Sequence, residues 1–325
     1  MFYICSFLDF ESTGVFWVDF FKPFIHSRGA LHSMKESNAV RSIGLQACDI
    51  LWMRNLAAES VDEVRNPAMT IDPNDEAEQI LPDPTFWVWD DRLRPEEKEI
   101  IDEANEALLR LSDTRAIEIN ASGPFLRSKL AWKIAVYAHG LQHRVVGLSD
   151  AVALCWNSRS TLGAMLNARA LLETIAVVAH LERTIQRLLR IEDIGALNDF
   201  IDNGTFAKRD REVLSKSPDI EARNILTSIA VLEKTIPGTR AHYDRLSERC
   251  HPNYMGHVAL FSELNREDGS VSFRKERHPD TNAQAVLGAY LFLPLVEDKL
   301  ISVTDHNTLV SDLQHRLNPV VNEQP

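Results

Sequence analysis

The stretch from residue 149 to 189, "SDAVALCWNSRSTLGAMLNARALLETIAVVAHLERTIQRLL", constrains the fold most, because it contains no proline and a single glycine, Gly163. Its apolar residues recur every three or four positions, which places them on one face of an α-helix. Glycine weakens a helix interior. The stretch therefore predicts either one long helix or two helices joined at Gly163.

Helical periodicity continues on both sides of this stretch. Residues 94–113 have Pro95 and then acidic residues at their start, as helices commonly do, and residues 124–146, 219–236 and 282–317 are amphipathic. Residues 257–276 instead have apolar segments on either side of an "REDG" turn, which predicts a β-hairpin. The predicted fold class is all-α, a multi-helix bundle with a minor β-hairpin near 257–276.

The chain divides into two regions of different character. Residues 1–90 show no clear periodicity, and their last part contains four prolines and a cluster of acids. This composition is typical of an extension and linker, in which the "TFWVW" segment (85–89) is expected to dock on the main body. Residues 91–320 form the predicted helical domain.

Composition limits the partners and the compartment. The formal net charge is −12, so an RNA contact would need a local basic patch, and no DNA partner is predicted. The four cysteines are scattered without a C-x-x-C pair, which favours a reducing cytoplasm. The longest uncharged apolar run, 286–296, is too short to cross a bilayer, and the N-terminus does not resemble a signal peptide, so no membrane partner is predicted.

Common catalytic motifs are absent from the sequence. It has no P-loop, no G-x-G-x-x-G, no G-x-S-x-G and no H-E-x-x-H. Any chemistry is therefore expected from side chains carried on helices, with no cofactor and no metal. His139 and His143 have the spacing of two ligands on one helix face, but helix-surface and core histidines are commoner than metal sites.

Arg169 and Glu173 lie four residues apart, one turn along the same helix face. On a helical wheel Arg169 falls near the centre of an apolar stripe and Glu173 near its edge. The stripe consists of Leu162, Met165, Leu166, Leu172, Ala176 and Ala179. A charge in a buried stripe needs a partner. The pair is expected to be either a structural ion pair that fixes helix register or part of a functional polar pocket.

The stretch "HYDRLSERCHPNYMGH" (242–257) gathers titratable groups at a helix end, because Pro252 stops the helix. The predicted buried face carries Tyr243, Leu246, Ser247 and Cys250, with His251 at its edge. We expect this face to meet Arg169 and Glu173 in one polar network. Cys250 beside His251 could be a nucleophile, but sequence neighbours on a helix point apart, which favours a packing role.

The segments "RALLE" (169–173) and "YDRLSERCHPN" (243–253) resemble those of an uncharacterised bacterial helical family, a domain of unknown function with a HEPN-like bundle. Many HEPN (higher eukaryote and prokaryote nucleotide-binding) domains are metal-independent ribonucleases of toxin and defence systems. Their signature is an arginine a few residues before a histidine near a helix end, which Arg245 and His251 match. The resemblance implies an RNA-acting, ribonuclease-like protein with these two as catalytic residues. The supporting polar network predicted around them consists of Arg169, Glu173, Tyr243, Ser247 and Asn253.

In such an enzyme the histidine would be the general acid and base, and the arginine would stabilise the developing phosphorane charge. Leu246, however, stands where active family members usually carry a polar residue. Arg245 and His251 would also point about 120° apart on a helix, so they would converge only in a cleft completed by a second subunit, a homodimer. The alternative is a non-catalytic helical scaffold or sensor whose polar cluster is structural. An open cleft with His251 and an arginine at its mouth would favour the enzyme, whereas a sealed, hydrogen-bonded cluster would favour the scaffold.

The run "KRDREVLSK" (208–216) is a basic patch. Most such runs are solvated surface. It is nevertheless the best local candidate for a phosphate contact.

Overall fold

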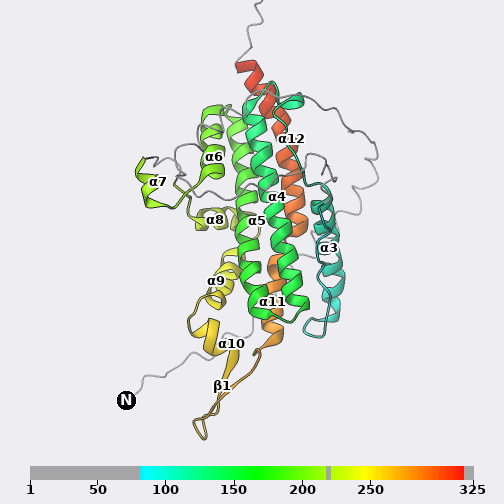
Figure 1. Ribbon diagram of the computed structural model, residues 1–325, viewed down its shortest axis with the longest axis vertical. Coiled ribbons are helices and arrows are strands. Elements are labelled where there is room, and N and C mark those ends of the chain that lie inside the picture. Colours follow the sequence, from blue (N-terminus) through cyan, green and yellow to red (C-terminus); the bar gives the residue numbers. More distant parts are fainter. Residues whose placement is uncertain (1–80, 217–220, 318–325) are drawn as a thin grey trace, which may run out of the picture. The chain divides into compact units, whose positions relative to one another are not determined.

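The computed structural model describes residues 81–216 and 221–317 and confirms the predicted fold class, a helical bundle with one small antiparallel sheet among these residues (Figure 1). The α-helices are α3 (Lys98–Asp113), α4 (Lys129–Asn157), α5 (Thr161–Arg190), α6 (Ile194–Phe206), α7 (Arg211–Lys216), α8 (Ile225–Thr235), α9 (Thr239–Cys250), α10 (Ala259–Phe261), α11 (Pro279–Tyr290) and α12 (Leu293–Leu317). Short helices of other types are η3 (Pro95–Glu97), η4 (Gly123–Phe125) and η6 (Tyr254–Val258), and the strands are β1 (Ser262–Leu264) and β2 (Val271–Phe273). Residues 1–80 of the predicted extension lie outside the described residues.

The long stretch 149–189 is two helices, and they join before Gly163 rather than at it. Helix α4 ends at Asn157, and the chain reverses through Arg159, which has a φ of +54°. Gly163 lies in the first turn of α5, where a Cβ would sit 3.0 Å from the Cys155 Sγ and 3.0 Å from the Ser160 Oγ. Gly163 therefore allows the two helices to approach closely, because it has no Cβ. The chain turns between the helices at Arg159, which has the left-handed conformation.

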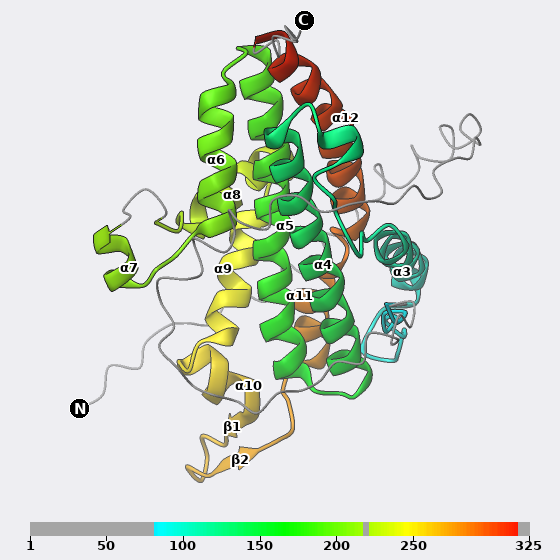
Figure 2. The same ribbon diagram turned by 45° about the horizontal axis from the view of Figure 1, so that its top comes forward.

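Helix α5 is the centre of the bundle. It contacts α4, α6, α8, α9, α11 and α12, and Figures 1 and 2 show these helices around it. It is long and apolar enough to span a bilayer, but 56% of its most apolar window is buried inside the bundle. The core helix of a soluble protein has the same character, so this helix is weak evidence for a membrane span.

The predicted apolar stripe of α5 is only partly correct. Met165, Leu172, Ala176 and Ala179 are buried, whereas Leu162 is 36% and Leu166 is 47% exposed. The buried surface of α5 instead extends around other positions, including Ala168, Leu171 and Ile175. Helices pack against α5 on several sides, so its buried surface is wider than one stripe. The neighbouring helices leave Leu162 and Leu166 partly uncovered, and this part of the predicted stripe is exposed.

The "TFWVW" segment docks on the helices as predicted. The side-chain amide of Asn105 in α3 donates to the Trp87 carbonyl (2.9 Å) and accepts from the Trp87 N–H (3.0 Å). Asn157 at the end of α4 makes the same pair of contacts, to the Val88 N–H (3.0 Å) and the Phe86 carbonyl (2.9 Å). The Trp87 ring stacks on Trp156 with centroids 4.7 Å apart. The packed unit thus includes residues before position 91, where the helical domain was predicted to begin.

The predicted hairpin is present but shorter than 257–276. Strands β1 and β2 pair antiparallel, with Ser262 opposite Phe273 and Leu264 opposite Val271. In Figure 2 the hairpin extends away from the helices beyond α10. Gly269, with a φ of +73°, closes the turn by donating its N–H to the Asn265 carbonyl (3.0 Å). Residues 254–261, which precede β1, are helical instead of extended.

Candidate functional site between α5 and α9

Helices α5 and α9 meet through three of the predicted network residues. The Tyr243 hydroxyl donates a hydrogen bond to Glu173 Oε1 (3.0 Å), and Arg169 Nε lies 3.3 Å from the same oxygen. The Arg169 guanidinium carbon also lies 5.8 Å from the centroid of the Tyr243 ring. Glu173 is therefore shared between a cation on its own helix and a phenol on the neighbouring helix.

The cluster is half-buried rather than central to the core. The side chains of Arg169 and Glu173 are each 28% exposed, whereas Tyr243 is buried. The helical-wheel position of Arg169 at the centre of a buried stripe is thus wrong. The Arg169 Nε makes an ion pair with Glu173, but the contact does not have the geometry of a hydrogen bond, and the Nε has no hydrogen-bond partner among the described residues.

The electrostatics of the cluster keep its cation charged and its neighbouring thiol neutral. Burial lowers the pKa of Arg169, but interactions with the Tyr243 hydroxyl and the Glu173 charge outweigh it and the pKa is raised. Burial raises the pKa of the Cys250 thiol, and the nearby Arg169 and Arg249 offset this only in part. A thiol protonated at neutral pH is a poor nucleophile, which supports a packing role for Cys250.

Ser247 and Asn253 lie outside this cluster. Ser247 is half-buried, and in the described chain no hydrogen bond joins its hydroxyl to Glu173 or Arg169. Asn253 instead closes the end of α9, because its side chain donates to Glu248 Oε2 (2.7 Å) and accepts from the Gly256 N–H (3.0 Å). The turn is so tight that a Cβ at position 256 would lie 1.8 Å from the His251 carbonyl oxygen.

The two predicted catalytic residues do not share a site within one chain. Arg245 lies on an exposed part of α9, and His251 is exposed just after the helix, where its backbone is extended (φ −84°, ψ 149°). Between these two described side chains there is no hydrogen bond or ion pair. Two of the hollows on the described part of the chain lie elsewhere, and neither residue lines them.

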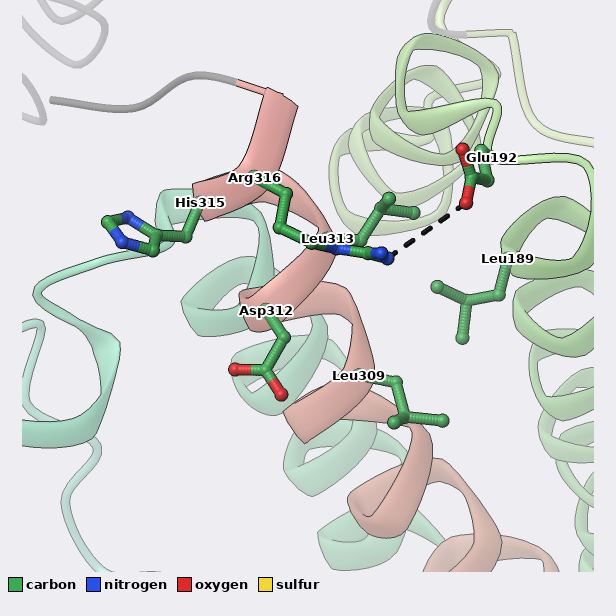
Figure 3. Close-up of a pocket in the computed structure, with 7 residues that line it drawn as sticks. All are labelled: Leu189, Glu192, Leu309, Asp312, Leu313, His315 and Arg316. Carbon is green, nitrogen blue, oxygen red and sulfur yellow. Dashed lines mark ion pairs between the residues drawn. The ribbon is translucent and has the colours of Figure 1, made fainter.

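One of those hollows lies at the far ends of α5 and α12 (Figure 3). It has a volume of about 590 Å³ and is lined partly by Leu189, Leu309 and Leu313. Figure 3 shows Arg316 pointing across it toward Glu192, at an N–O distance of 3.9 Å. Arg316 and Glu192 thus pair with each other across the hollow.

His242 is a buried residue whose environment the sequence did not predict. It is 2% exposed and lies against Gly288 of α11, where a Cβ would sit 2.6 Å from the imidazole Cε1. Burial lowers its pKa to about 3, and the charges of Arg245 and Arg249 act in the same direction. Its imidazole is therefore neutral at physiological pH and serves the contact between α9 and α11.

The i, i+4 histidines of α4 hold a loop. His139 Nδ1 accepts from the Ala116 N–H (3.3 Å), and His143 Nε2 lies 2.9 Å from the Ala116 carbonyl oxygen. Both nitrogens are thus engaged by one residue of the segment after α3. Across residues 81–216 and 221–317, no group of three or more histidine, cysteine, aspartate or glutamate side chains could hold a metal ion.

The Glu173–Tyr243 hydrogen bond can be measured by a double-mutant cycle. Glu173→Ala and Tyr243→Phe are each expected to lower the free energy of unfolding by about 1 kcal/mol, because the bond reaches a charged acceptor but is partly solvated. Urea unfolding of both single variants and the double variant gives the coupling, which we expect to be about 0.5–1 kcal/mol. Asp102→Asn, which breaks the exposed Lys98–Asp102 pair on α3, is the control and should cost less. A coupling near zero would mean that this bond does not hold α9 on α5.

Comparison of the chain with protein-family models, with curated proteins and with solved structures finds no match. The HEPN-like resemblance therefore stays a prediction that rests on the two short sequence segments.

Proposed function

We propose that this chain is a non-catalytic helical scaffold or sensor of the cytoplasm, in which the Arg169–Glu173–Tyr243 cluster is structural. The observation that carries the proposal is the direction of the polar contacts. Glu173 is engaged by a cation and a phenol that belong to the bundle itself. Asn253 is engaged by the end of its own helix. These side chains hold helices together and present no open, convergent set of groups to a substrate.

A metal-independent ribonuclease of HEPN-like type is the second candidate. Its support is that Arg245 and His251 both reach solvent, so that RNA or a second copy of the chain has access to them. His251 would be the general acid and base, and Arg245 would stabilise phosphorane charge. A homodimer would have to bring together residues that one chain keeps apart.

Incubation of the purified full-length chain with structured and single-stranded RNA, in the presence of a chelator, separates the two candidates. We expect no cleavage above background, and the same background for the His251→Ala variant. His257→Ala, an exposed histidine nearby, is the matched control. Cleavage by the wild type and by His257→Ala, but not by His251→Ala or Arg245→Gln, would overturn the scaffold proposal. Sedimentation of the same samples would show whether any activity follows a dimer.

A further inference from the structure

A hollow of about 400 Å³ lies against α5 and α6, with Arg223, just before α8, on its wall. Figure 1 shows α6 and α8 on the same side of α5. Its lining includes Thr184, Arg187, Asp199, Phe200, Asn203 and Arg223. The volume lies within the range of pockets that bind small molecules.

Arg223 is held in place by an aromatic ring. Its guanidinium carbon lies 3.9 Å from the centroid of the Phe200 ring. His180 packs edge-on against the same ring, with centroids 5.3 Å apart, and its Nδ1 lies 3.0 Å from the Ser228 hydroxyl. A guanidinium stacked on an aromatic face keeps its N–H groups available at its edge.

The charge around the hollow is positive. Within the described residues, no carboxylate lies at ion-pair distance from Arg183, Arg187 or Arg223. Asp199 is the acidic residue of the lining, and it is exposed, as are Arg187 and Arg223. Burial lowers the pKa of His180, and the positive charges of Arg223, Arg187 and Arg183 lower it further. All three cations therefore lie close enough to affect the same imidazole.

The basic run "KRDREVLSK" lies beside this hollow. The Ala222 N–H, adjacent to Arg223, donates to the Lys208 carbonyl (2.8 Å), and Lys208 forms a bridge with Glu221. The start of the run therefore lies next to the wall that carries Arg223. In a chain with a net charge of −12, the run adds further basic residues near Arg223, although its Lys216 pairs with Glu212.

We propose that the hollow between α5 and α6 binds a small molecule that carries a phosphate group, with Arg187 and Arg223 as the anion ligands. Guanidinium forks match phosphate oxygens in pairs, and cations that lack a carboxylate partner are available for such a ligand. Thr184 and Asn203 supply polar groups at the wall. The site is separate from α9 and its histidine, so the inference goes beyond the proposed function and does not depend on it.

Calorimetric titration of the full-length chain with pyrophosphate, AMP and adenosine tests this site. We expect pyrophosphate and AMP to bind and adenosine not to bind. Arg187→Met and Arg223→Met should each weaken pyrophosphate binding at least about tenfold, and Arg223→Lys, which keeps the charge but loses the fork, should weaken it less. Raising the salt concentration should weaken binding of the wild type.

The matched control is Arg159→Met, an exposed arginine in the α4–α5 connection, and it should bind pyrophosphate as the wild type does. Circular dichroism and thermal unfolding of every variant show whether it is folded. Three results would each overturn the proposal: no pyrophosphate binding by the wild type, equal loss in Arg159→Met and Arg187→Met, or equal binding of AMP and adenosine.

Discussion

Lowering the pH from 7 to 4 is expected to remove about 3 kcal/mol from the free energy of unfolding through His242 alone. The pKa of its buried imidazole is about 3 in the folded protein, against an ordinary value of 6.5. Between these two values the unfolded chain binds a proton that the folded chain does not bind. Stability that is present above pH 6.5 is therefore lost as the pH falls toward 3, and His242 causes no further loss below that.

Carboxylates also contribute to acid unfolding, so the measurement needs a difference between two proteins. Urea unfolding of the wild type and of His242→Gln, followed from pH 7 to pH 4, isolates the histidine because the carboxylates are common to both. The stability of the wild type relative to the variant should fall by about 3 kcal/mol over this range. Parallel curves for the wild type and His242→Gln would contradict a neutral, buried His242.

Replacing Trp156 by alanine is expected to lower the free energy of unfolding by about 3–5 kcal/mol. The Trp156 side chain is fully buried, stacks on Trp87 with centroids 4.7 Å apart, and has the Arg92 guanidinium carbon 3.5 Å from its ring centroid. Its loss would leave a large cavity and remove the aromatic face on which the buried Arg92 lies. Urea unfolding measures the loss directly.

Two further tryptophan substitutions test whether this loss of stability comes from the stack of Trp156 on Trp87. Trp156→Phe keeps an aromatic ring in the stack, and the indole Nε1 of Trp156 has no hydrogen-bond partner in the described part of the chain, so this change should cost much less. Trp132→Ala removes a half-buried tryptophan of the same helix and should also cost less. Equal losses for Trp156→Ala and Trp132→Ala would mean that the stack on Trp87 contributes little.

The sequence was sufficient to predict the contact between Arg169, Glu173 and Tyr243. A charged pair one turn apart and a tyrosine on an amphipathic face are both local patterns, and each is expected to seek a polar partner when its helix packs. The exposure of Leu162 and Leu166 could not be predicted in the same way. It depends on which neighbouring helix covers each part of α5, and one helix's periodicity does not contain that information.

The positions of His242 in α9 and of His251 just after it could not be predicted from helical periodicity either. Helix α9 packs on α5, α8 and α11, so it has more than one buried side, and His242 faces the side against α11. A helical wheel drawn for one buried face places such a residue outside the core. The spacing of Arg245 and His251 likewise matched a signature, but the helix ends at Cys250, and the path of the chain after it decides where His251 points.

The docked segment 85–89 is held much as a bound peptide would be. Asn105 and Asn157 pair with its backbone N–H and carbonyl groups, and the Trp87 side chain stacks on Trp156 in an aromatic recess. The helices therefore bind this neighbouring segment through its backbone and through one buried side chain. Only a few residues separate this segment from α3, which gives it an effective concentration on the order of millimolar or higher. A free peptide of the same sequence would therefore compete poorly for the recess, and the binding surface is occupied in cis from the moment the chain folds.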